Sequence, residues 1–274
     1  MKNRIIYGAI LIALLLLCVF LSPITRVLFF AAAGCLCARE YSKQMEKLGM
    51  ACSLYVMILY LLLQAVLVLL NAGSSACAAL FIGAVYLAML SGILRKRVSG
   101  NGAIDTVAGL AYPCLLFGAI MAISVSSIWL ETLTIACLAT WSCDNGAFLG
   151  GSRYGKHKLA PAISPNKTIE GAGIGALSSI LAGVLVYYLG MWCANTAWLG
   201  SLYAPVPLWL CVVTSFVAST MGQIGDLAES LIKRMIGVKD FSNLIPGHGG
   251  MFDRADSLLF SVPTAYLCLR LAGL

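Results

Sequence analysis

The stretch MACSLYVMILYLLLQAVLVLLN, residues 50–71, contains no Asp, Glu, Lys or Arg. About 20 consecutive apolar residues cross the hydrocarbon core of a bilayer as a helix, so this stretch predicts a transmembrane helix. The rest of the chain has a similar character, since 61% of its 274 residues are hydrophobic and 11% are charged. Soluble domains have about 45–50% apolar and about 25% charged residues. The composition therefore predicts an integral membrane protein.

Comparable apolar stretches lie on both sides of residues 50–71. We predict about nine transmembrane helices, which makes the fold class an all-α integral membrane protein. Pro23 separates the first two spans, because proline disrupts a helix interior. A signal peptide with a processing site in AAAGC, residues 31–35, is the alternative for the first span, but the apolar stretch before it is long and broken. The predicted spans are Ile5–Ser22, Ile24–Ala38, Met50–Asn71, Ser75–Leu94, Ala103–Ser124, Ser127–Cys143, Glu170–Leu189, Val206–Gly225 and Asp256–Gly273.

The positions of the 18 Lys and Arg residues predict the orientation of these spans. All except Arg26 and Arg270 fall in the N-terminal segment or in loops that follow an even-numbered span. Cytoplasmic loops carry the excess of basic residues, so we expect a cytoplasmic N-terminus and an outside C-terminus. The expected location is the inner (cytoplasmic) membrane, with multiple passes and a site facing the cytoplasm.

Two regions are predicted along the chain. Residues 1–140 form an N-terminal transmembrane region of about six spans, the sixth ending near residue 143. Residues 141–274 form a C-terminal catalytic region with long cytoplasmic loops at 144–169 and 226–255. The net charge of +7 is scattered among loops without interleaved aromatic residues, which argues against nucleic acid and favours anionic lipid and nucleotide phosphate as partners. The 11 cysteines include no CxxC pair, so a zinc site is not expected.

The two long loops and their borders contain acidic as well as basic residues. Ordinary cytoplasmic loops of membrane proteins need only the bases. Carboxylates bind hard cations, and Lys or Arg binds phosphate oxygens, so the mixture predicts a metal and phosphate site. The acidic residues concerned are Asp144, Glu170, Asp226, Glu229, Asp240, Asp253 and Asp256.

The first candidate element is GQIGDLAESLIKR, residues 222–234. If the eighth span continues as a helix, then Asp226, Ser230 and Lys233 share one face at i, i+4 and i+7. That face carries a carboxylate, a hydroxyl and an ammonium group. The alternative is an ordinary ion-pair stripe on a helix leaving the bilayer. The position at the lipid boundary favours a functional site.

The second element is IPGHGGMFDRAD, residues 245–256. Its glycines allow close approach of the backbone to a ligand, and free N–H groups at a helix start bind anions. Asp253 and Asp256 are expected in the first helical turn. The alternative reading is a glycine turn with Asp253 as a helix cap and His248 as a loop residue. That reading leaves Arg254 at a helix start unexplained unless an anion is near.

The third element is DNGAFLGGSRYGKHKLAPAISPNKTIEG, residues 144–171. Ser164 to Thr168 lead directly into the seventh span, which places Lys167 at a helix N-terminus, where an anion is favoured. For Arg153, Lys156 and Lys158 a role in topology and lipid headgroup binding is an equal alternative. The chain has no GxxxxGK[ST], HExxH or GxSxG motif, so the residues favour metal-assisted phosphoryl or nucleotidyl transfer.

The segment SLIKRMIGVKDFSNLIPGHGGMFDRAD, residues 230–256, resembles the signature of the phosphatidate cytidylyltransferase (CDP-diacylglycerol synthase) family. The upstream DNGAF and GKHKLAPAISPNKT segments are also similar to that family, so dense similarity covers residues 144–256. The first 140 residues resemble it only as spans with the turn ARE at 38–40. Ser152 departs from the pattern, because many relatives carry a base there, and Arg153 is the neighbouring substitute.

The resemblance implies that CTP and phosphatidic acid give CDP-diacylglycerol and pyrophosphate. It also implies Mg2+, with K+ as a candidate second ion, and a homodimer in the membrane. Asp226 and Asp253 match the family's metal ligands, and we add Asp256 as a candidate ligand. The candidate catalytic residues are Asp226, Asp253, Lys233 and Lys167. The candidate substrate-binding residues are Asp144, Asn145, Ser164, Lys167, Ser230, Lys233, Arg234, Lys239, His248, Gly249, Gly250 and Arg254.

Two other functions remain open from the residues. A CTP-dependent lipid kinase of the polyprenol type is also embedded in the membrane and depends on a metal. An ion-coupled transporter belongs to a different class, and intramembrane carboxylates also mark ion paths. The key acids of this chain fall at the ends of spans, which favours an enzyme at the membrane surface.

Overall fold

The computed structural model describes residues 18–95, 100–196, 203–244 and 249–274, and these are mostly helical. They divide into two compact units. The first unit contains Met1–Val125 and Met235–Arg254, and the second contains Ser126–Arg234 and Ala255–Leu274. The chain therefore leaves the first unit after α6, forms most of the second, returns to the first unit at Met235, and enters the second unit again at Ala255. This division differs from the predicted regions 1–140 and 141–274, because contiguous hydropathy does not report which helices pack together.

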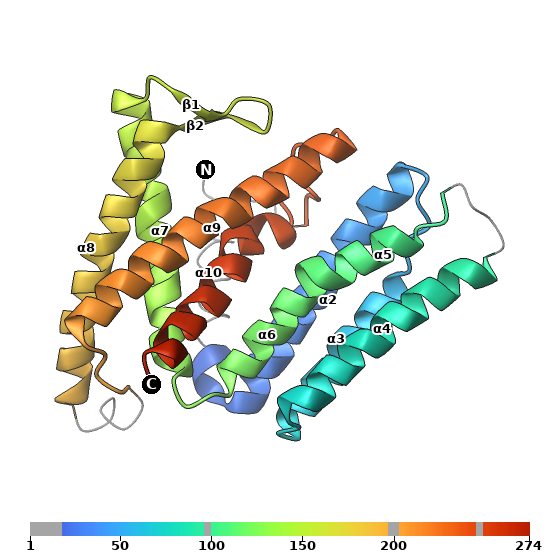
Figure 1. Cartoon of the computed structure of the whole chain (residues 1–274), viewed down its shortest axis with the longest axis horizontal. Helices are drawn as coiled ribbons and strands as arrows, with labels where there is room; N and C mark the ends of the chain where they lie inside the picture. Colours follow the sequence, from blue (N-terminus) through green and yellow to red (C-terminus); the bar gives the residue numbers. More distant parts are fainter. Residues whose placement is uncertain (1–17, 96–99, 197–202, 245–248) are drawn as a thin grey trace. The chain divides into compact units, whose positions relative to one another are not determined.

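Helix α2 of the first unit packs between neighbours that are near and far in the sequence (Figure 1). Helix α2 contacts α3 and α6, and α3 contacts α4. The predicted span at 103–124 has the observed outer bounds but is interrupted, because Pro113 supplies no backbone N–H and Tyr112 leaves helical geometry. The elements are α2 (Pro23–Lys47), α3 (Leu54–Leu69), α4 (Ser74–Leu94), α5 (Ala103–Gly109), the π-helical turn η1 (Leu110–Cys114) and α6 (Leu115–Ser124).

The start of α2 is set by its sequence. Ser22 is the N-cap, its side chain accepts a hydrogen bond from the backbone of Thr25, and Pro23 occupies the first helical position, which proline favours. Arg26, an exception to the charge pattern, is buried one turn later. Its Nε donates to the Ser124 carbonyl oxygen at 2.8 Å. The arginine thereby joins the start of α2 to the end of α6.

The second unit consists of long helices and one short hairpin. Strands β1 and β2 are antiparallel, with Lys158 opposite Thr168 and Ala160 opposite Ser164. Helix α10 begins in the first unit, and its residues from Ala255 onward belong to the second. The elements are α7 (Trp129–Tyr154), β1 (Lys158–Ala160), β2 (Ser164–Thr168), α8 (Ile169–Ala194), α9 (Leu208–Ile236) and α10 (Phe252–Leu271).

Helices α7 and α8 run side by side along a seam of small residues (Figure 1). A Cβ atom on Gly175 would lie 2.7 Å from the Cys143 carbonyl oxygen, and one on Gly171 would lie 2.8 Å from that of Ala147. Glycine is therefore needed where the two backbones approach most closely, as is common between helices in membranes. Further along, Ser219 on α9 donates to the Ser179 hydroxyl on α8 at 2.8 Å. These contacts hold α8 against α7 and α9.

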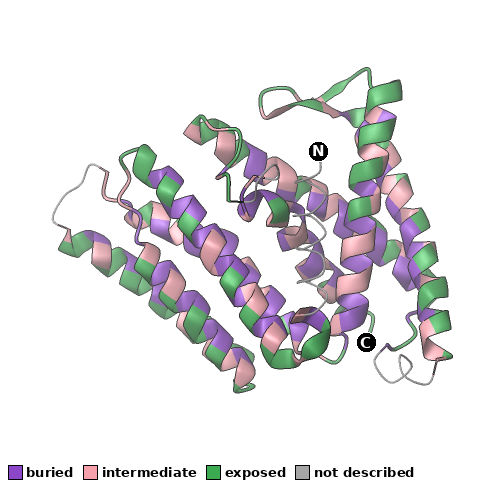
Figure 2. Cartoon of the chain, turned by 180° about the vertical axis from the view of Figure 1, so that it is seen from behind, coloured by how far each residue is buried: buried purple, intermediate pink, exposed green. Residues whose placement is uncertain are grey.

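The exposed surface of the helices is apolar over long stretches. Leu181 and Leu185 on α8 remain 70% and 62% exposed, and most of α4 is exposed or half-buried (Figure 2). Such surfaces are unfavourable in water and natural in lipid. In the described part of the chain, four helical segments are long and apolar enough to cross a membrane, at Ser74–Leu94, Ala103–Ser124, Ile169–Ala194 and Leu208–Ile236. The chain is an all-α, multi-pass membrane protein.

Several helices extend beyond the predicted spans. Helix α2 continues from the predicted end at Ala38 to Lys47, α7 from Cys143 to Tyr154, and α9 from Gly225 to Ile236. Hydropathy marks where lipid contact is expected to end, whereas the helix continues wherever its backbone hydrogen bonds persist. The loops expected at 144–169 and 226–255 therefore begin with helical turns. Most of the predicted first span lies outside the described residues.

Candidate metal and phosphate site

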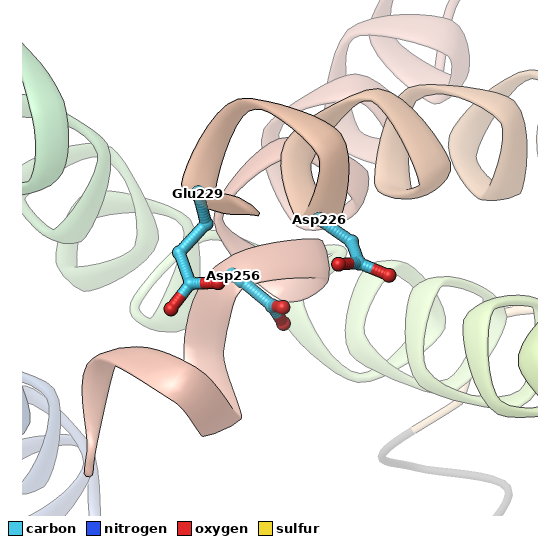
Figure 3. Close-up of side chains that lie close together, drawn as sticks. All are labelled: Asp226, Glu229 and Asp256. Carbon is cyan, nitrogen blue, oxygen red and sulfur yellow. The ribbon is translucent and has the colours of Figure 1, made fainter. Parts of the chain in front are cut away.

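Three carboxylates gather at the C-terminal part of α9 and the start of α10. Asp226 and Glu229 lie on one face of α9, and Asp256 projects toward them from α10 (Figure 3). Carboxylate oxygens of the three residues lie within 4.8 Å of one another. Gly225 makes this approach possible, because a Cβ atom there would lie 2.6 Å from the Asp256 carbonyl oxygen. Like charges this close favour a bound cation.

Basic and hydroxyl groups adjoin two of these acids. The Lys167 Nζ lies 2.5 Å from Asp226 Oδ2, and the Ser230 hydroxyl donates to Asp226 Oδ1 at 3.3 Å. Lys233 Nζ forms an ion pair with the fully buried Glu229. Helix α9 extends to Ile236, so the condition under which Asp226, Ser230 and Lys233 share one face, a helix that continues beyond the predicted span, is met. The site therefore holds anionic and cationic groups together, as the sequence indicated.

Lys167 reaches the site from strand β2 of the hairpin. The hairpin base is fixed by Glu170, whose carboxylate accepts hydrogen bonds from the backbone N–H groups of Lys156 and His157. The His157 ring Nδ1 also lies 2.6 Å from Glu170 Oε1. Thr168 caps α8 by accepting from the Gly171 N–H at 3.1 Å. The cap ends the strand and places Lys167 immediately before the helix, as predicted.

A cavity of about 470 Å³ adjoins Lys167 and Asp226 in the second unit. Asp144 and Gln223 add polar groups to its wall, whereas Phe148 contributes apolar surface. Small residues of the α7 and α8 seam, Gly151 and Gly171 among them, also line it. The cavity therefore presents charge at one part and hydrocarbon at another, which suits an amphiphilic ligand.

Asp144 lies just beyond the predicted sixth span and lines this cavity. Asp144 is exposed at the cavity wall. Neighbouring protein atoms still reduce the hydration of its carboxyl group and raise the pKa of Asp144 to about 6, and the negative charge of Asp226 acts in the same direction. The ammonium group of Lys167 opposes both effects. The protonated form of Asp144 is thus favoured more than in water, mainly through reduced hydration and secondarily through the charge of Asp226.

The chain matches the model of the cytidylyltransferase family over residues 2–272. It belongs to this family. A phosphatidate cytidylyltransferase of Bacillus subtilis (strain 168) is 41% identical over 137 residues, which cover 50% of this chain and 46% of the relative. One of Staphylococcus haemolyticus is 39% identical over 140 residues, covering 51% and 49%. The match spans about half the length of these curated relatives.

In this member of the cytidylyltransferase family, Asp253 belongs to the first unit. Its carboxylate Oδ2 accepts hydrogen bonds from the Phe241 N–H at 3.0 Å and the Gly250 N–H at 2.8 Å. Gly249 has a φ of +81°, which favours glycine, and a Cβ there would lie 3.1 Å from Asp253 Oδ2. Asp253 thus organises the glycine segment, and its role as a metal ligand stays a prediction.

The other candidate residues take several positions. Asn145 is exposed and donates back to the Trp141 carbonyl oxygen at 2.8 Å, and Arg234 Nε donates to the Ile163 carbonyl oxygen at 3.1 Å. Arg234 thereby ties α9 to the hairpin turn. Ser164 pairs with Ala160 in the hairpin. Lys239 and Arg254 are exposed. His248 lies outside the described residues.

Two acids with structural roles here are absent from the predicted ligands: Glu229 was named only among the acids of the long loops, and Glu40 was not predicted to take part. Glu229 joins the carboxylate group of Asp226 and Asp256, and its i+3 spacing from Asp226 was the available signal. Glu40 contacts the segment around Gly250 and Asp253, although more than 200 residues separate them in the chain. Its only local signal was the ARE sequence at 38–40, which was predicted as a turn but lies within the continuous helix α2. Long-range contacts of this kind have no periodic signature in the sequence.

Proposed function

We propose that this chain is a phosphatidate cytidylyltransferase that makes CDP-diacylglycerol and pyrophosphate from CTP and phosphatidic acid. Membership of the cytidylyltransferase family supports the transfer of a cytidylyl group. The curated relatives named above carry the name phosphatidate cytidylyltransferase. The observation that carries the proposal is the group of Asp226, Glu229 and Asp256 beside two lysines, because two anionic substrates require both kinds of charge.

The residues present fit a magnesium ion. Mg2+ prefers oxygen ligands and is commonly held by one or two carboxylates together with substrate phosphates. Asp226 and Asp256 offer carboxylates in the second unit, and Asp253 is the ligand that the family resemblance adds. When bound, Mg2+ supplies Lewis-acid stabilisation of phosphate oxygens. A monovalent ion such as K+ is a second candidate for the same carboxylates.

The reaction forms one P–O bond and breaks another. An oxygen of the phosphatidate phosphate attacks the α-phosphorus of CTP, and the bond from that phosphorus to the oxygen bridging the α- and β-phosphates breaks. Pyrophosphate leaves with the bonding electrons. The attacking oxygen is already ionised at neutral pH, so the chain need not supply a strong general base. Positioning and electrostatic stabilisation therefore dominate.

Lysine and arginine side chains perform that stabilisation. The ammonium groups of Lys167 and Lys233 lie beside Asp226 and Glu229, respectively. When substrate binds, its phosphate oxygens contact these ammonium groups in place of the carboxylates or together with them. Lys239 and Arg254 are exposed and available to a polyphosphate, and His248 is a candidate hydrogen-bond donor. These groups offset the mutual repulsion of the two substrates.

The cavity beside Lys167 is the proposed place of the lipid headgroup. Its polar wall at Asp144, Gln223 and Asp226 adjoins the apolar side chain of Phe148. The acyl chains then stay in lipid while the phosphate contacts Lys167. We further propose nine spans, a cytoplasmic N-terminus, a site facing the cytoplasm of the inner membrane, and a homodimer. CTP reaches such a site from the cytoplasm.

The test is incubation of the purified protein in detergent with CTP, phosphatidic acid and Mg2+, followed by identification of the products. We expect CDP-diacylglycerol and pyrophosphate in equal amounts. Asp226→Asn and Asp253→Asn are expected to remain folded and to lose turnover. Glu46→Gln is the matched control, because Glu46 is an exposed acid on α2.

The products separate this proposal from its rivals. Release of CDP with a newly phosphorylated lipid would identify a CTP-dependent kinase instead. Ion movement in liposomes without consumption of CTP would identify a transporter. Near-normal turnover of Asp226→Asn or Asp253→Asn would remove that residue from the metal site while leaving the overall activity established.

A further inference from the structure

Glu40 is a buried acid of the first unit that the proposed mechanism does not use. It lies on α2 with 6% of its surface exposed. Its Oε1 accepts hydrogen bonds from the Ser242 hydroxyl at 2.6 Å and the Met251 N–H at 3.0 Å, and its Oε2 accepts from the Phe252 N–H at 2.9 Å. A buried carboxylate is costly unless hydrogen-bonded, and these three donors satisfy it.

The donors belong to the two ends of one functional segment. Ser242 follows α9, whereas Met251 and Phe252 lie at the start of α10, where backbone N–H groups lack partners within the helix. A carboxylate at this end is also favoured by the helix dipole. Gly249 and Gly250 lie between the two ends and belong to the segment that resembles the family's signature. Glu40 therefore clamps both ends of the segment that carries candidate substrate-binding residues.

Gly250 shows how closely the clamp fits. A Cβ atom on Gly250 would lie 2.7 Å from both carboxylate oxygens of Glu40, closer than real Cβ contacts. The Gly250 N–H donates to Asp253 Oδ2, which also accepts from the Phe241 N–H. One turn further along α2, the Gln44 side chain donates to the Phe241 carbonyl oxygen. One turn of α2 thus supports Asp253 through its backbone partners.

We infer that Glu40 is a positioning residue for the transfer reaction, which holds the Gly249–Asp253 segment in its working geometry. This inference rests on the proposed function, because it assigns that segment to the active site. Glu40 acts through Met251, Phe252 and Gly250, and it does not need to touch substrate. Groups that orient the ligands of a metal commonly change metal affinity or activity about 10–100-fold when they are replaced.

The test compares Glu40→Gln with Glu46→Gln on the same helix. Glutamine keeps the size of glutamate but puts an NH2 group where one carboxylate oxygen accepts a backbone N–H. We expect Glu40→Gln to lower kcat about 10–100-fold while the KM for CTP changes less. The affinity for Mn2+ alone, measured by paramagnetic resonance in the absence of substrate, is expected to fall by a similar factor. Glu46→Gln is expected to match the wild type in both measurements.

Ser242→Ala is a second variant that tests the inference even if Glu40→Gln does not fold. It removes one of the three donors and leaves the two backbone contacts of Glu40, so the protein is expected to fold and lose kcat and Mn2+ affinity severalfold. Wild-type kcat and Mn2+ affinity in folded Glu40→Gln overturn the inference. If Glu40→Gln does not fold, wild-type values in Ser242→Ala overturn it. A wild-type protein that neither binds Mn2+ nor makes CDP-diacylglycerol instead refutes the proposed function, so the two failures are distinguishable.

Discussion

Gly175→Ala is expected to loosen the packing of α7 against α8. The new Cβ atom would lie 2.7 Å from the Cys143 carbonyl oxygen, about 0.7 Å short of ordinary van der Waals contact. It would also lie 3.0 Å from the Cβ of Ala147, so atoms on two successive turns of α7 must move. Overpacking of this kind costs about 1–3 kcal/mol. The free energy of unfolding should fall by that amount.

Gly173→Ala is the matched control on the same helix. Gly173 is exposed, and a Cβ atom there meets nothing within 4 Å. Alanine lowers the conformational entropy of the unfolded chain and favours helix, so this variant should be more stable by about 0.5–1 kcal/mol. The two alanines therefore shift stability in opposite directions although they lie two residues apart.

Unfolding of both variants in mixed detergent micelles, followed by circular dichroism at increasing fractions of denaturing detergent, measures the difference. The separation between them should reach about 1.5–4 kcal/mol. Gly175→Ala should also lower turnover, because α7 carries Asp144 and α8 follows Lys167. Equal stability of the two variants would refute the close approach of the α7 and α8 backbones.

Three further predictions concern the site itself. Lys167→Met should lower kcat about 10²–10³-fold, because it removes an ammonium group that stabilises the developing phosphate charge. A wild-type kcat in this variant would exclude Lys167 from the mechanism. Gly250→Ala should reproduce the kinetic defect of Glu40→Gln, because its Cβ displaces that carboxylate, and the double variant should lose little more than either single variant. Removal of Mg2+ with a chelator should abolish product formation without changing the helical circular dichroism signal, and added Mg2+ should restore it, whereas persistent turnover would exclude the metal.

Local periodicity predicted the part of the site that lies on one element. The i, i+4 spacing placed Ser230 beside Asp226, and the observed hydrogen bond joins those side chains. The position of Lys167 before a helix followed from the turn-forming residues that precede it and from the apolar run that follows. Both features depend on neighbours within a few residues, which a single sequence displays.

Contacts between distant segments could not be predicted in the same way. Asp256 meets Asp226 because Gly225 lets α10 approach α9, and no repeat in either segment encodes that approach. The hairpin was also missed, since its strands are short and rich in charged and turn-forming residues. Four of the predicted spans overlap helical segments of the described residues that are long and apolar enough to cross a membrane. Hydropathy placed the end of α9 too early, because polar residues continue the helix beyond its apolar stretch.

The base of the hairpin has a consequence for how the site can be altered. The Ile169 N–H donates to the His157 carbonyl oxygen at 2.9 Å, and Glu170 accepts from the His157 N–H, so the segment leaves and rejoins the helices at neighbouring points. Because its two ends are adjacent, this segment can be exchanged for one of another length without separating α7 from α8. Residues 158–168 are therefore a cassette, and grafting a cassette from a relative should change headgroup preference while the helical scaffold is retained.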